Sequence, residues 1–98
     1  MADKREKMTE EEFDKLIDAE MAELTDEELD GIAGGVLYAY QKAGIIAACK
    51  IAKLSGYTLD DMDYIFDAAR RAQIREGSVG NTTAEELEGF IRSVWPSI

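Results

Sequence analysis

Side chains that could carry out catalysis or bind a metal are sparse in this 98-residue sequence. It contains no histidine and a single cysteine, Cys49. Without histidine the commonest general base is missing. One cysteine forms no internal disulfide and, with no histidine partner, no zinc site. We therefore expect a protein that is not an enzyme and that uses no cofactor and no small-molecule substrate.

Cys49 lies within an apolar segment, and its residue type allows three interpretations. A free cysteine among apolar neighbours usually behaves as a small buried hydrophobe. The alternatives are a thioether to a dehydrated serine or threonine, of which one cysteine would permit only one ring, and an intermolecular disulfide formed after export.

Four aspartates close in sequence are the nearest approach to a metal-binding motif: Asp60, Asp61, Asp63 and Asp67. They lack the alternating loop ligands and the central glycine of a calcium-binding loop. Aspartates at the start of a helix also interact favourably with its dipole. We expect a solvated helix face and no metal site.

The adjacent glycines Gly34-Gly35 follow a short helical pattern, and glycine is the usual residue just past the end of a helix. Thr25 and Glu28 form a capping box, which begins a helix, and Leu29 and Ile32 lie one turn apart on it. Glycine has no Cβ, so this stretch can enter a narrow proteolytic cleft that a larger residue would block.

The charge of the sequence changes at the same point. Residues 1–35 hold 13 acids and 4 bases, a net charge of −9, whereas residues 36–98 hold 8 acids and 7 bases, a net charge of −1. Such asymmetry suggests two parts with different roles. Nucleic acid is not an expected partner, because phosphate contacts need a basic surface.

The residues before the glycine pair match a known pattern of Leu, Ser or Thr, two free positions, Glu-Leu, two free positions, an aliphatic residue, one free position and Gly-Gly. The matching residues are Leu24, Thr25, Glu28, Leu29, Ile32, Gly34 and Gly35. Residues 1–35 therefore resemble the double-glycine leaders of bacteriocins and related ribosomally made peptides. The resemblance does not extend to residues 36–98.

The resemblance implies cleavage between Gly35 and Val36 by the cysteine-peptidase domain of a bacterial ABC exporter, which then carries the cargo out. Leu24, Leu29 and Ile32 would form an apolar ridge that docks in a groove of the peptidase, a common way to recognise a helix. Residues 1–35 would then be an acidic leader and residues 36–98 a helical cargo.

Apolar spacing and capping residues predict an all-α protein, a small helical bundle of about five short helices with two in the leader and three in the cargo. Capping boxes at Thr9 and Thr25, and threonines that open or cap a helix at Thr58 and Thr83, mark four of the starts. The expected elements cover residues 10–23, 25–33, 36–54, a helix that begins at Thr58 and ends near Arg75, and a helix from Thr83 to Trp95.

The segment Val36–Leu54 has a wide apolar surface and three lysines. Lys42, Lys50 and Lys53 fall within an arc of roughly 80° on a helical wheel. One interpretation is a face that contacts a membrane or a partner protein; the other is the central core helix of the cargo. The residues assigned to the membrane or partner face are Leu37, Tyr38, Ile45, Ile46, Lys42, Lys50 and Lys53.

We thus expect a cytoplasmic precursor of a secreted bacterial peptide, bacteriocin-like or signalling. The sequence begins without the apolar stretch of a secretory signal peptide, so export would need the dedicated transporter. The alternative is an uncleaved cytoplasmic helical domain that binds other proteins, in which residues 10–33 pack on the rest through their apolar stripes.

Overall fold

The computed structural model describes residues 8–25, 27, 39–77 and 82–98, and all regular structure within them is helical. The α-helices are α1 (Glu10–Glu23), α3 (Ala39–Leu54), α4 (Met62–Glu76) and α5 (Ala84–Val94). A 3₁₀ turn, η1 (Leu59–Asp61), leads into α4, and another, η2 (Trp95–Ser97), follows α5. The all-α prediction is confirmed. The expected helix over 25–33 falls almost entirely outside the described residues.

Threonine caps begin three of the helical elements, as the sequence predicts. In each, the hydroxyl accepts a hydrogen bond from a backbone N–H of the first turn, and the threonine N–H donates to a carboxylate three residues later. The pairs are Thr9 with Glu12, Thr58 with Asp61 and Thr83 with Glu86. Such a cap stabilises a helix by about 1 kcal/mol, so the element boundaries are largely set locally.

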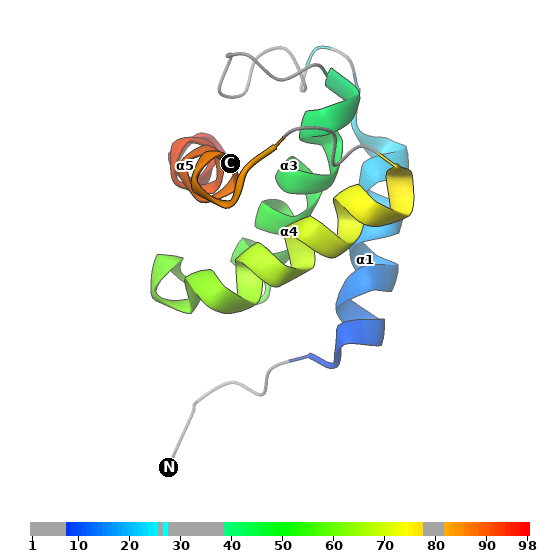
Figure 1. Ribbon diagram of the computed structural model, residues 1–98. Coiled ribbons are helices and arrows are strands. Elements are labelled where there is room, and N and C mark those ends of the chain that lie inside the picture. The colour runs from blue at the N-terminus through cyan, green and yellow to red at the C-terminus, as the bar shows by residue number, and fades with distance from the viewer. Residues whose placement is uncertain (1–7, 26, 28–38, 78–81) are drawn as a thin grey trace.

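Helix α3 lies at the centre of the molecule and packs against α1, α4 and α5. In Figure 1, α1 and α5 flank the α3–α4 pair on opposite sides. The α3–α4 contact is close because its residues are small: a Cβ built at Gly44 would lie 3.0 Å from the Cβ of Ala72. This close approach gives the two central helices a fixed position against which α1 can dock.

The core combines residues of all four helices. Helix α1 contributes Phe13 and Ile17, both with no exposed surface. Residues from before and after Gly35 therefore share one core. The completely buried apolar residues of the other helices include Ile45, Ile46, Ala47, Ala48, Cys49, Ala52, Ile65, Ala68, Ala69, Ala72, Leu87, Ile91 and Val94.

Two large apolar residues of the helices lie at the surface. Leu16 of α1 is 45% exposed, and Leu54 at the end of α3 is 82% exposed. The helical period correctly groups residues on one side of a helix. It does not say how far around the helix the neighbouring elements reach, and in α1 only Phe13 and Ile17 are fully buried.

Candidate functional site

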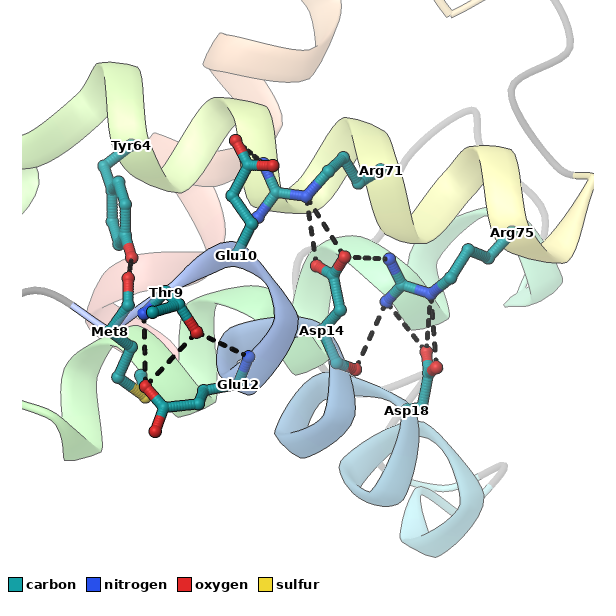
Figure 2. A network of polar contacts seen from close by, with 9 residues as sticks. All are labelled: Met8, Thr9, Glu10, Glu12, Asp14, Asp18, Tyr64, Arg71 and Arg75. Carbon is teal, nitrogen blue, oxygen red and sulfur yellow. Dashed lines mark hydrogen bonds and ion pairs between the residues drawn. The ribbon is translucent and has the colours of Figure 1, made fainter.

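The contact between α1 and the rest of the chain begins with hydrogen bonds to the backbone of Met8. The N–H of Met8 donates to the hydroxyl of Tyr57 over 3.0 Å, and the hydroxyl of Tyr64 donates to the carbonyl of Met8. Figure 2 shows Tyr64 of α4 pointing at this carbonyl just before α1 begins. The two tyrosines thus bind a peptide backbone at both its donor and its acceptor.

An aromatic cluster lies below these hydrogen bonds. The ring of Phe13 is 6.1 Å from that of Tyr57 and 5.3 Å from that of Tyr64, and the two tyrosine rings meet edge to face at 5.1 Å. Burial and then the neighbouring hydroxyl of Tyr57 raise the pKa of Tyr64 to about 12. Tyr64 therefore remains a neutral donor at neutral pH.

Ion pairs continue the contact along α1 and α4. The guanidinium of Arg71 lies 3.1 Å from Asp14, and that of Arg75 lies 3.2 Å from Asp14 and 2.8 Å from Asp18. Figure 2 shows the carboxylate of Asp14 between the two arginines and that of Asp18 directed towards Arg75. Each pair is partly exposed, so its individual contribution is about 1 kcal/mol or less. The shared Asp14 makes them a network with a defined register.

A further ion pair joins α1 to α3, where Lys50 lies 3.1 Å from Glu20. The acids of α1 thus face basic residues of both central helices. Part of the charge difference between residues 1–35 and 36–98 is therefore explained by acids of the first segment pairing with bases of the second within the same chain.

The residues expected to be recognised by the exporter are only partly placed. Leu24 is half-buried against the core, its N–H donating to the carbonyl of Met21, and Thr25 is exposed. The remaining positions of the motif lie outside the described residues: Glu28, Leu29, Ile32, Gly34, Gly35 and Val36.

The residues assigned to a membrane or partner face do not form one exposed surface. Ile45 and Ile46 are fully buried, and Lys42 is 5% exposed. In this fold they belong to the central helix of the core, one of the two interpretations that the sequence left open. Leu37 and Tyr38 lie outside the described residues.

The other two lysines of the predicted stripe bind different parts of the molecule. Lys50 pairs with α1, whereas the ammonium of Lys53 donates to the carbonyls of Trp95 and Ile98, each over 2.8 Å, and lies 5.5 Å from the Trp95 ring centre. The 80° arc is therefore divided between two neighbours, because α1 and α5 approach α3 from different sides.

Cys49 is fully buried, and burial raises the pKa of its thiol to about 12. The positive charge of nearby Lys53 lowers this pKa, but by less than burial raises it. The thiolate is the reactive form of cysteine. In the folded chain Cys49 is therefore a small hydrophobe of the core, and a thioether would have to form before folding.

The described residues contain no group of three or more histidine, cysteine, aspartate or glutamate side chains placed to hold a metal ion. The carboxylate of Asp61 instead accepts a hydrogen bond from the Thr58 N–H. In the same part of the chain, no helix has the length and apolar content needed to cross a bilayer.

The sequence predicts packing of residues 10–33 on the rest of the chain only in its alternative interpretation, and Tyr64, Arg71 and Arg75 are not among the predicted site residues. One signal was available: the acids Asp14 and Asp18 and the bases Arg71 and Arg75 are both spaced by four residues. Equal spacing permits two helices to pair in register.

Comparisons with protein-family models, with curated proteins and with solved structures gave no significant match for this chain.

Proposed function

We propose that this protein is the precursor of a secreted bacterial peptide, bacteriocin-like or signalling. Its leader, residues 1–35, is cut after Gly35 by the peptidase domain of an ABC exporter. The precursor is then cytoplasmic, and residues 36–98 are exported. The observation that carries this proposal is the complete double-glycine pattern from Leu24 to Gly35.

The position of the pattern in the fold supports the proposal. Helix α1 ends at Glu23 and α3 begins at Ala39, so the pattern lies, in sequence, between these two described helices. A cut after Gly35 would sever none of the four described α-helices. The cargo would keep α3, α4 and α5 complete.

The proposed cleavage requires no catalytic group from this chain. The peptidase supplies the nucleophile, and the precursor supplies a scissile bond with no side chain on either of the two residues before it. The apolar positions Leu24, Leu29 and Ile32 then set the distance from the docking groove to that bond.

We expect Gly34→Val and Gly35→Val to abolish processing in the native host, because a Cβ at either position would clash in a cleft shaped for glycine. Helicity measured by circular dichroism should be unchanged. Gly31→Val is the matched control, since position 31 is free in the pattern, and it should still be cut. Processing is followed by mass spectrometry of cells and supernatant. Efficient cleavage of either the Gly34 or the Gly35 variant would contradict the proposed mechanism.

An uncleaved helical domain that binds other proteins is the second candidate. Complete burial of Phe13 and Ile17 favours it, since α1 shares the core with the other helices. This candidate predicts only the intact chain inside cells, and it predicts that the Gly35→Val variant behaves like the wild type.

A further inference from the structure

The surface of the cargo that α1 covers has a defined composition. We call it the α1-binding face: Lys50 of α3, Tyr57 in the turn after α3, and Tyr64, Arg71 and Arg75 of α4. If the leader is cut and left behind, as the proposed function requires, the mature cargo carries this face without its cover.

The three cations of the face indicate the charge of the group that binds there. In the precursor, Lys50, Arg71 and Arg75 all interact with carboxylates of α1. A guanidinium is a planar fork suited to carboxylates. Arg71 and Arg75 lie one turn apart on α4, so they match two carboxylates one turn apart on another helix.

The two tyrosines indicate that the occupant is a polypeptide. The Tyr57 hydroxyl accepts from a backbone N–H, and the Tyr64 hydroxyl donates to the carbonyl of the same residue, Met8. Lipid hydrocarbon offers neither group. The same tyrosine rings contact Phe13, so an aromatic side chain four residues into the occupying helix completes the pattern.

We propose that the mature cargo uses the α1-binding face to bind an acidic amphipathic helix of a second protein, and that α1 occupies this place in the precursor. The required helix carries two apolar residues four apart, like Phe13 and Ile17, beside two carboxylates four apart, like Asp14 and Asp18. In the precursor α1 is covalently linked to the face, and its effective concentration, on the order of millimolar, excludes a competitor. Cleavage removes that advantage.

The test uses the full-length chain and a fluorescein-labelled peptide of residues 8–25 as the probe. Asp14→Arg/Asp18→Arg places like charges against Arg71 and Arg75 and should release α1 from the face. We expect this variant to bind the peptide at least about tenfold more tightly than the wild type does, because the tethered competitor is gone. Adding Arg71→Glu/Arg75→Glu restores opposite charges and should abolish the gain.

The matched control is Glu11→Arg/Glu23→Arg, which changes the net charge equally at two exposed positions of α1. It should bind the peptide no better than the wild type does. A peptide with Phe13→Ala/Ile17→Ala should bind the opened variant weakly.

A second measurement is needed if the opened variant, Asp14→Arg/Asp18→Arg, does not fold. A site-specific protease sequence inserted after Gly35 gives the two fragments in vitro without the exporter. The labelled peptide should then exchange with fragment 1–35 in the cut chain, and not in the uncut chain. Failure of the peptide to exchange would overturn the inference whatever happens in the native host. Exchange in vitro with no cleavage in the native host would instead overturn the proposed function and the role of the face in a mature cargo, while the binding of an acidic helix to the face would stand.

A last measurement tests whether the face binds a membrane instead, with vesicles made of equal parts of phosphatidylcholine and phosphatidylglycerol. We expect neither the opened variant nor the cut chain to bind them more strongly than the wild type. Binding to vesicles without binding to the peptide would overturn the inference in favour of a membrane surface.

Discussion

At the scale of single residues, Phe13 is where residues 1–35 depend most on the rest of the chain. Its ring is fully buried and touches both Tyr57 and Tyr64. The apolar spacing of residues 10–23 predicts a helix with a face that packs against other residues. It does not predict which residues those are, because Tyr57 and Tyr64 lie more than forty positions further along the sequence and no local pattern connects them.

We expect Phe13→Ala to lower the free energy of unfolding of the full chain by about 3–5 kcal/mol, the usual cost of removing a buried phenylalanine side chain. Urea denaturation followed by circular dichroism measures the loss. Leu16→Ala is the control on the same helix, because Leu16 is 45% exposed and should cost less than about 1 kcal/mol. Equal losses in the two variants would show that α1 does not dock as described.

Cys49 gives a second prediction at this scale. The pKa of its thiol is raised from 9.0 to about 12 by burial. The neutral thiol therefore contributes stability that is fully present below about pH 9 and is lost as the pH rises towards 12.

We expect a thiol reagent at pH 8 to label the folded chain slowly and the chain in urea rapidly. Cys49→Ala should also flatten the decline of stability between pH 9 and 12 relative to the wild type. Labelling at the same rate with and without urea would contradict the burial of Cys49.

At the scale of elements, local chemistry predicted more than global geometry did. Threonine caps gave the starts of α1, the turn into α4 and the start of α5, because a cap acts within a few residues. The positions of the helices relative to one another were less predictable from the sequence. The wheel placed Lys42, Lys50 and Lys53 on one side of α3, but their surroundings depend on which helix lies opposite each residue, and that is a tertiary property.

Two glycines within helices test the close packing of α3 on α4. Gly89→Ala in α5 has open space around the new Cβ and should stabilise the protein by about 0.5–1 kcal/mol through helix propensity. Gly44→Ala gains the same propensity but places its Cβ 3.0 Å from that of Ala72. Overpacking costs about 1–3 kcal/mol, so we expect a net loss. Thermal unfolding of both variants measures the difference, and equal stabilisation would contradict the close approach of these helices.

At the scale of the whole molecule, the sequence divides into an acidic third and a nearly neutral remainder, while the structure joins α1 to the other helices in one core. These two observations are compatible if another helix can replace α1 in its contacts with the rest of the chain. Its ion pairs with Lys50, Arg71 and Arg75 are partly exposed, and its buried apolar contact centres on Phe13 and Ile17. The residues against which α1 docks could not be predicted from the sequence, because charge and periodicity define a face but not its partner.

A cut after Gly35 would separate α1 from the helices against which it packs. Val36 would then become the first residue of a three-helix product whose α1-binding face is open to a partner.

The most direct test is mass spectrometry of the culture supernatant of the native host, with cells analysed in parallel. We expect a secreted fragment that begins at Val36 and ends at Ile98, with fragment 1–35 retained in the cells. Intact chain confined to the cells, with no fragment starting at Val36 in either fraction, would contradict the proposal that Gly35 is the cleavage site of an exported peptide precursor.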